Sequence, residues 1–432
     1  MKEPAINPNL MQSIIWVNIK ISTISDKFLE TRHAFIHLFR LQSCLAANIP
    51  MSDYPVIHWN EAGEEKSARW YSEKNAPPPK RILVIDDRMT VDAAYRLACE
   101  GTALLWRGDF QNARQLLQAL TRRMDKKSPG RKTKETDASP AETFHLHRQA
   151  QSQRARILSQ LLIPFNADHS IPLHRAPDAR AACLEAYGSG TEAYIASLRE
   201  LQGLIGAYEW RKKGVEIPAL GARIHPYYGV FAPIRSEYVG LVAKTPLPPL
   251  VATHSVAFDI GTGTGILAAV LARRGIQRIV ATDMDLRALD CARDNLTRLE
   301  LMNQIDLVQA NLFPAGQASL IVCNPPWVPA RPSSPLEHAI FDPESRMLLR
   351  FLQGLSTHLA PGGEGWLILS DFAEHLALRT RAELLAAIEA AGLKVLSKSD
   401  VKPHHPRVSD TSDPLHAART AELTSLWRLT AQ

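Results

Sequence analysis

With 432 residues, of which 45% are hydrophobic and 22% charged, the chain has the composition of a globular protein with two or three domains. No stretch approaches the roughly 18 consecutive apolar residues of a membrane span, and the first residues lack the pattern of a signal peptide. The five cysteines are dispersed and form no C-x-x-C pair, which favours reduced thiols in a cytoplasmic protein over a disulfide framework or a zinc site. We therefore expect neither membrane association nor a bound metal.

The formal net charge of +6 is unevenly distributed. Residues 1–214 hold 30 Lys and Arg against 23 Asp and Glu, a net charge of +7, whereas residues 215–432 hold 20 against 21, a net charge of −1. Because an excess of positive charge attracts polyanions, the first half predicts a partner such as RNA. A solvated basic surface that binds nothing specific is the alternative.

The first part of the chain gives weak structural signals. Residues 1–50 are interpreted as an N-terminal extension, either mobile or preceding a true start at Met51. Residues 51–124 are interpreted as an α/β or helical region, with a short strand and two amphipathic helices predicted at 81–85, 91–100 and 109–122.

A basic segment follows, RRMDKKSPGRKTK at 122–134, with seven basic residues and one acid. Together with the Ser, Thr, Asp and Pro residues after it, this composition predicts a disordered basic linker over 125–141. Helical patterns over 142–213 would complete a basic, mainly helical domain for substrate recognition. The candidate contacts with a polyanionic substrate are Lys126, Lys127, Arg131 and Lys132.

Strand and helix patterns alternate from residue 255 onward, so that residues 214–432 predict a doubly wound, Rossmann-like α/β domain with a seven-stranded sheet. The predicted strands are 255–260, 278–283, 305–309, 319–323, 365–370, 393–397 and 423–429. The predicted helices are 265–274, 286–299, 343–359 and 379–391.

The first turn of this domain reads FDIGTGTGIL. Its G-x-G-x-G spacing differs from the dinucleotide fingerprint G-x-G-x-x-G, which favours a cofactor made of an adenosine and an amino-acid tail over one with phosphates. Asp283 ends the next strand, where an acid can accept the ribose hydroxyls, and Asp259 can reach the ammonium group of the tail. The candidate cofactor-binding residues are Asp259, Gly261, Thr262, Gly263, Gly265, Asp283, Met284, Asn311 and Leu312, the last two near the adenine. A tight turn without a ligand is the alternative.

A second motif, IVCNPPW, follows the fourth predicted strand. Two prolines end the strand because proline cannot donate to a sheet ladder, and they leave Asn324 at the carboxyl edge, where ligands bind in open α/β sheets. Read by itself, the motif could also be a strand-ending turn with an aromatic plug.

FDIGTGTGIL, ATDMD and IVCNPPW, in this order, resemble the class I S-adenosylmethionine-dependent methyltransferases. Within them they are similar to the small-domain branch that methylates planar nitrogens, including release-factor glutamine, rRNA and adenine-N6 methyltransferases. The resemblance covers about residues 220–430 and implies S-adenosylmethionine as cofactor. Departures are Asn311, where Asp is usual, Ser319, where an Asp is frequent, and Trp327 in place of Tyr or Phe.

The NPPW residues are the candidate catalytic group: Asn324, Pro325, Pro326 and Trp327. The Asn324 side-chain oxygen and the Pro325 carbonyl can each accept an N–H from a planar nitrogen, and the proline rings hold both acceptors in place. Trp327 offers a flat face for stacking.

Weaker candidates for substrate contacts are Tyr228 and Arg235, the latter with a structural ion pair as the alternative. The loop Val328–Asp342 is a candidate substrate lid. Together these residues predict an N-methyltransferase that acts on RNA or a ribosomal component. The alternatives are a protein glutamine N5-methyltransferase acting on a translation factor or ribosomal protein, and a non-catalytic RNA-binding protein that retains the fold.

Overall fold

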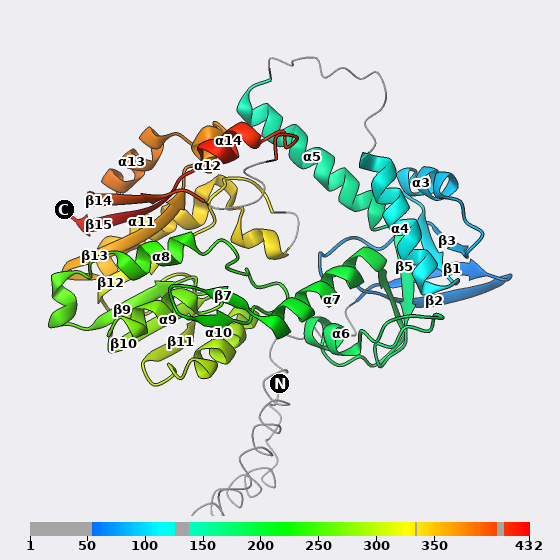
Figure 1. Cartoon of the computed structure of the whole chain (residues 1–432), viewed down its shortest axis with the longest axis horizontal. Helices are drawn as coiled ribbons and strands as arrows, with labels where there is room; N and C mark the ends of the chain where they lie inside the picture. Colours follow the sequence, from blue (N-terminus) through cyan, green and yellow to red (C-terminus); the bar gives the residue numbers. More distant parts are fainter. Residues whose placement is uncertain (1–53, 126–137, 333–334, 404–409) are drawn as a thin grey trace, which may run out of the picture. The chain divides into compact units, whose positions relative to one another are not determined.

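Two large β-sheets and one two-stranded sheet organise the residues that the computed structural model describes, 54–125, 138–332, 335–403 and 410–432 (Figure 1). These residues lie within one unit of the chain, residues 48–432. Among them, no helix has both the length and the apolar character needed to cross a membrane.

The seven-stranded sheet of the second half has the order β11-β10-β9-β12-β13-β15-β14. The first five strands of this order run parallel, and β15 is antiparallel to both of its neighbours. The predicted seven-stranded, doubly wound sheet is confirmed. Its strands are β9 (Val256–Ile260), β10 (Arg278–Asp283), β11 (Ile305–Gln309), β12 (Ala318–Cys323), β13 (Leu359–Ser370), β14 (Leu393–Val401) and β15 (Thr424–Ala431).

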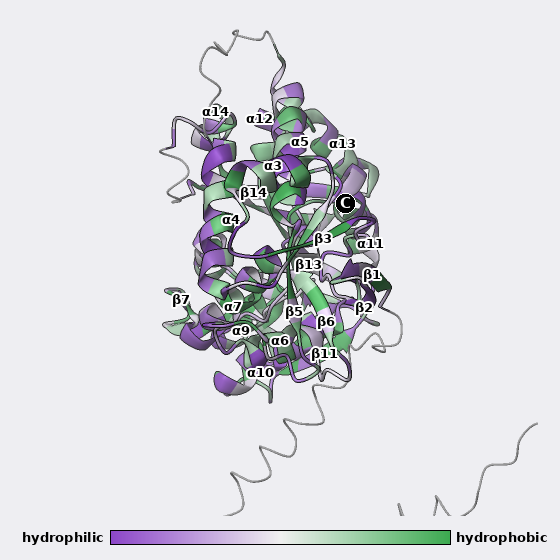
Figure 2. Cartoon of the chain, turned by 90° about the vertical axis from the view of Figure 1, so that its right-hand side faces the viewer, coloured by the Kyte–Doolittle hydropathy of each residue, from purple (hydrophilic) through white to green (hydrophobic). Residues whose placement is uncertain are grey.

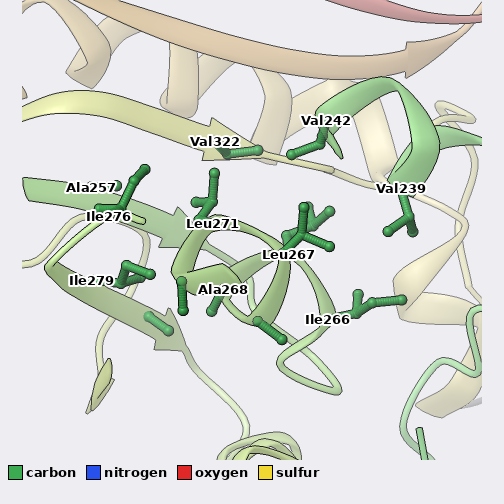
Figure 3. Close-up of a cluster of buried hydrophobic side chains, with 14 of the residues drawn as sticks. Val239, Val242, Ala257, Ile266, Leu267, Ala268, Leu271, Ile276, Ile279 and Val322 are labelled. Atoms are coloured by element: carbon green, nitrogen blue, oxygen red, sulfur yellow. The ribbon is translucent and has the colours of Figure 1, made fainter. Parts of the chain in front are cut away.

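Helices cover both faces of this sheet, because the strands are apolar on both sides. On one face α8, α9 and α10 contribute to a buried apolar cluster, in which Val239 and Val242 of α8 lie close to Leu267 of α9 (Figure 3). On the other face α11 and α13 form a second cluster with the strands. The helices of this half are α8 (Glu237–Lys244), α9 (Ile266–Arg273), α10 (Leu286–Arg298), α11 (Arg346–His358), α12 (Phe372–His375), α13 (Arg381–Ala390) and α14 (His416–Ala421), with 3₁₀ turns η3 (Pro249–Ala252), η4 (Pro335–Ala339) and η5 (Pro343–Ser345).

The first half contains a six-stranded mixed sheet with the order β1-β2-β6-β5-β4-β3. The domain predicted as mainly helical therefore also has a sheet, which for residues 51–124 agrees with the α/β interpretation. Its strands are β1 (Val56–Glu61), β2 (Glu64–Trp70), β3 (Ile82–Ile85), β4 (Ala103–Trp106), β5 (Leu161–Phe165) and β6 (Tyr194–Ser197). A two-stranded sheet, β7 (Val215–Ile217) and β8 (Ala222–Ile224), follows in the chain.

Five helices accompany the six-stranded sheet: α3 (Val91–Cys99), α4 (Phe110–Asp125), α5 (Pro140–Leu158), α6 (Arg180–Tyr187) and α7 (Leu198–Lys213). The helices carry both polar and apolar turns (Figure 2), as expected where one face covers a sheet. Ser139 begins α5 with a capping box, because its hydroxyl accepts from the amide of Glu142 while the Glu142 carboxylate accepts from the Ser139 amide. Residues 126–137 of the expected linker, with all four candidate basic residues, lie outside the described residues.

Candidate functional site

The strand order of the second sheet reverses between β9 and β12. Ile260 at the end of β9 lies opposite Cys323 at the end of β12. The next residue of each strand, Gly261 and Asn324, therefore leaves the sheet beside the other. Ligands of open α/β sheets bind at such a reversal, outside the carboxyl ends of the strands. The structure thus brings the two predicted motifs together at the position where a ligand is expected.

The glycine turn after β9 requires glycine at three positions. Gly261, Gly263 and Gly265 have φ angles of 72°, 54° and 80°, in the left-handed region that side chains disfavour. A Cβ at Gly265 would lie 3.2 Å from Cβ and 3.3 Å from Cα of Ala292, so this position of the turn also needs the space. The amides of Gly261 and Thr262 donate to the Thr282 carbonyl at 2.9 and 2.8 Å, which fixes the turn against β10.

Asp283 ends β10 with both carboxylate oxygens facing backbone amides. Oδ2 accepts from Gly263 N at 3.0 Å and Oδ1 accepts from Asp285 N at 3.0 Å. Burial nevertheless raises the pKa of Asp283 above its ordinary value. A carboxylate offers about four acceptor positions, and the amides of Gly263, Asp285 and Met284 donate to this one, so capacity remains for a ribose hydroxyl.

Asp259 is fully buried on β9, and one of its oxygens lacks a partner. Oδ2 accepts from Thr262 Oγ1 at 2.6 Å and from Ala268 N at 3.0 Å, whereas Oδ1 has no hydrogen-bond partner among the described residues. Burial raises the pKa of Asp259 to about 6. A buried carboxylate oxygen without a donor is destabilising, and a cationic group of a ligand, directly or through water, would compensate it. The geometry of Asp259 is therefore compatible with its predicted role toward an ammonium group. The Thr262 side chain orients the Asp259 carboxylate.

The predicted adenine side of the site lies at the ends of β10 and β11. Met284 is 66% exposed, so its side chain is free to cover a ligand. Leu312 has a φ of 76°, and its carbonyl accepts from Thr282 Oγ1 at 2.6 Å. Asn311 beside it is exposed. These residues border the same edge of the sheet as Asp283.

Asn324 is half-buried, and its side chain is already oriented by Trp327. The indole Nε1 of Trp327 donates to Asn324 Oδ1 at 2.9 Å. The Trp327 ring meets Tyr238 edge-on, with centroids 6.5 Å apart, and the Arg235 guanidinium lies 5.5 Å from its centroid. The structure therefore gives Trp327 a contact that was not foreseen, since the sequence suggested only a stacking face.

Arg235 is held by two carboxylates beside this tryptophan. Its Nη2 donates to Glu422 Oε1 at 2.9 Å and its Nε to Glu237 Oε1 at 3.1 Å. Glu422 is buried and also accepts from Ser370 Oγ at 2.6 Å. The sequence offered a substrate contact or a structural ion pair for Arg235, and the structure shows the ion pair.

Tyr228 packs against the apolar cluster of the six-stranded sheet. Its carbonyl accepts from Arg287 Nη1 at 3.5 Å, and Arg287 also pairs with Glu73 at 3.1 Å. Tyr228 thus lies where the two halves of the chain meet. The four linker residues offered as substrate contacts are not among the described residues.

The loop after the NPPW motif is contacted by helix α5 of the first half. Arg148 donates to the Arg331 carbonyl at 2.7 Å, pairs with Glu337 at 3.2 Å and stacks 3.9 Å over the ring of Phe341. Phe144 is buried in a cluster with Val328, Phe372, Leu376, Leu415 and Ala418. The segment predicted as a substrate lid is therefore anchored by the first half of the chain.

One supporting residue escaped the sequence analysis. Asn295 of α10 is 1% exposed, its Nδ2 donates to the Thr264 carbonyl at 3.1 Å, and its Oδ1 accepts from the His225 amide at 2.7 Å. It ties the glycine turn to the segment before β9. An amide on the apolar face of a predicted helix was the available signal. In the described part of the chain, no group of three or more His, Cys, Asp or Glu side chains is arranged to hold a metal.

Comparison with known proteins finds similarity over the region that holds this site. Residues 241–391 match the family model "Methyltransferase small domain". A ribosomal protein L11 methyltransferase of Pelotomaculum thermopropionicum is 33% identical over 145 residues, which cover 33% of this chain and 39% of that protein. A release factor glutamine methyltransferase of Cereibacter sphaeroides is 32% identical over 134 residues, 30% of this chain and 43% of that protein. The chain thus spans less than half the length of these curated relatives.

Solved structures with a similar arrangement include the ribosomal protein L11 methylase of Lactobacillus delbrueckii subsp. bulgaricus, at 18% identity and a TM-score of 0.31. That match covers 46% of this chain and 79% of the other. Trm5b of Pyrococcus abyssi matches at 16% identity and a TM-score of 0.34, covering 50% of this chain and 54% of the other. The match of residues 241–391 to the methyltransferase small domain model covers the glycine turn, Asp283 and Asn324.

Proposed function

We propose that this chain transfers the methyl group of S-adenosylmethionine to a planar nitrogen of a component of the translation apparatus. The observation that carries the proposal is the position of Asn324, which leaves β12 beside the glycine turn of β9. Methyl transfer requires that the substrate and the cofactor are held next to each other. A hydrogen-bond acceptor and a glycine turn at the same edge of the sheet meet this requirement.

The described residues suit this cofactor. Asp283 would accept a ribose hydroxyl, and the free oxygen of Asp259 would face the ammonium group. Met284, Asn311 and Leu312 would border the adenine. The cofactor supplies a sulfonium-bound methyl group, which an attacking nitrogen lone pair can take.

Asn324 and Pro325 would orient that nitrogen. An amide or exocyclic amine nitrogen is a poor nucleophile because its lone pair is delocalised. Accepting its N–H groups at Asn324 Oδ1 and at the Pro325 carbonyl turns the lone pair out of the plane and stabilises the positive charge that develops. Asn324 Oδ1 keeps one lone pair for this purpose while it accepts from Trp327. Neither acceptor is basic, so the proton lost by the nitrogen passes to solvent.

Two substrate classes each have a specific observation in their favour. RNA or another ribosomal component is favoured by the net charge of +7 in residues 1–214. A protein substrate is favoured by the names of the relatives, one of which names a ribosomal protein and another a glutamine of a release factor. A non-catalytic RNA-binding role would make the complete set of Asp259, Asp283 and Asn324 superfluous.

Transfer of a tritiated methyl group into ribosomes and into lysate tests the proposal. We expect label in a macromolecular fraction with the wild-type protein and none with Asn324→Ala. Release of counts by nuclease assigns RNA, and release by protease assigns protein. Absence of label from both fractions, with S-adenosylmethionine bound in a calorimetric titration, would overturn the transfer reaction.

A further inference from the structure

A cavity of about 500 Å³ opens between three helices of the first half, α4, α5 and α7, far along the chain from the site described above. One arginine from each helix lines it: Arg122 of α4, Arg154 of α5 and Arg199 of α7. The remaining lining residues are Leu117, Gln118, Thr121, Leu158 and Gln202. Three guanidinium groups therefore converge on one hollow.

The described residues neutralise only one of these three charges. Arg154 pairs with Asp125. Arg199 Nη1 is buried and has no hydrogen-bond partner among the described residues. Arg122 is exposed at the last turn of α4, and no described carboxylate pairs with it. A buried guanidinium nitrogen without an acceptor, beside two further cations, is energetically unfavourable. A bound anion would compensate this arrangement.

The chemistry of the lining selects the kind of anion. A guanidinium presents several N–H donors in a planar fork that matches the oxygens of a phosphate, and the side-chain amides of Gln118 and Gln202 add neutral donors. The cavity is open, which suits a phosphate that belongs to a longer chain. The basic segment of residues 122–134 also begins at the rim, with Arg122.

We propose that this cavity between α4, α5 and α7 binds a phosphodiester group of RNA. It lies apart from Asn324 in the chain and would anchor a polynucleotide whichever atom is methylated. The proposal thus goes beyond the proposed function and does not depend on methyl transfer.

Binding of a fluorescein-labelled single-stranded RNA to the full-length chain, followed by anisotropy without S-adenosylmethionine, tests the proposal. Arg199→Gln is expected to raise the dissociation constant about tenfold, because a charge-assisted contact is lost. The slope of log affinity against log salt should flatten by about 0.7 for the lost phosphate contact. Arg122→Gln should also raise the dissociation constant. Because Arg122 is exposed, this substitution should leave the stability of the fold unchanged.

Arg156→Gln is the matched control. Arg156 lies on α5, is exposed and does not line the cavity. Its substitution therefore removes the same charge without changing the cavity. Equal effects of Arg156→Gln and Arg122→Gln would mean a diffuse attraction and overturn the proposal. So would unchanged RNA affinity in Arg199→Gln with an unchanged melting temperature. If pyrophosphate raises the melting temperature of the wild type and not of Arg199→Gln, while RNA binding is equal in both, the ligand is a small phosphorylated molecule and not RNA.

Discussion

Each half of the chain buries a carboxylate, and the two differ in how that carboxylate is satisfied. In the first half Glu200 accepts from the amide of Glu73 at 2.9 Å, from Tyr187 at 2.7 Å and from Ser72 at 3.3 Å, so that both of its oxygens are used. In the second half no described residue donates to Asp259 Oδ1. Two arginines differ in the same way: Arg235 is paired with Glu422, whereas the buried Nη1 of Arg199 has no hydrogen-bond partner among the described residues.

Burial alone therefore does not mark a functional group in this protein. Unused hydrogen-bonding capacity is informative where the group also lies at a ligand position or a cavity, since a folded chain normally satisfies its buried polar atoms. At the carboxyl edge of the second sheet Asp259 is such an acid and would face a cationic ligand, and in the cavity of the first half Arg199 is such a cation and would face an anionic one. The following experiments separate these two assignments.

The largest effect is expected from Asn324→Ala. It should lower kcat by about 10²–10³-fold, the usual cost of removing one preorganised hydrogen-bonding group from a transition state. S-adenosylmethionine affinity, from calorimetry, and RNA affinity, from anisotropy, should stay close to wild type. A variant that keeps about a tenth or more of wild-type turnover would remove Asn324 from the catalytic group.

The second largest effect is expected from Asp283→Ala, which should weaken the binding of S-adenosylmethionine. At least one hydrogen bond to a charged acceptor is lost, contributing about 1.5–3 kcal/mol, which brings calorimetric binding toward or below detection. The matched control is Asp306→Ala on the neighbouring strand β11, an exposed acid that pairs only with Arg278 in the described contacts. A normal titration curve for Asp283→Ala would assign the ribose to another residue.

A smaller effect concerns pH. Because the pKa of Asp259 is raised to about 6, its carboxylate is ionised at neutral pH and takes up a proton as the pH falls through 6. The negative charge facing the ammonium group is then lost, and S-adenosylmethionine affinity should fall by about tenfold between pH 7 and 5. Asp259→Asn should make this profile flat, while Glu200→Gln should leave it unchanged. A wild-type profile that is flat over this range would contradict the role of Asp259.

The smallest effect is expected from Trp327→Phe. The aromatic face is kept, but the indole donor to Asn324 Oδ1 is lost. One neutral hydrogen bond contributes about 1 kcal/mol, so kcat should fall by about fivefold with KM for S-adenosylmethionine unchanged. Unchanged kcat would show that the proline rings alone orient Asn324.

The sequence predicted the second sheet well and the first one poorly, for a physical reason. In the second half the central strands are short apolar runs between helices, as in Ala318–Cys323, where every residue is buried. In the first half Leu161–Phe165 and Tyr194–Ser197 directly adjoin helices α5 and α7. No turn residues separated them from the helical pattern, so both strands were merged into predicted helices. The strand Glu64–Trp70 is largely exposed and charged, and it gave no apolar signal.

The positions of the site residues were predictable because the motifs mark the ends of strands. Gly261 and Asn324 follow neighbouring strands, and Asp283 ends a third. Contacts that depend on tertiary structure were not predictable. Three such contacts are the hydrogen bond from Trp327 to Asn324, the bridge made by Asn295 and the packing of Tyr228 against the first half. In each of them the spacing of the residues along the sequence gives no sign that they touch.

The anchoring of the NPPW loop by Phe144 and Arg148 limits how this protein can be divided. A fragment beginning at Gly214 would contain every motif of the methyltransferase small domain. It would also expose Val328, Phe372 and Leu376, which the intact chain buries with Phe144, and it would leave Glu337 without Arg148. An apolar surface uncovered in this way favours aggregation. We therefore expect that a soluble fragment of the second half must include helix α5.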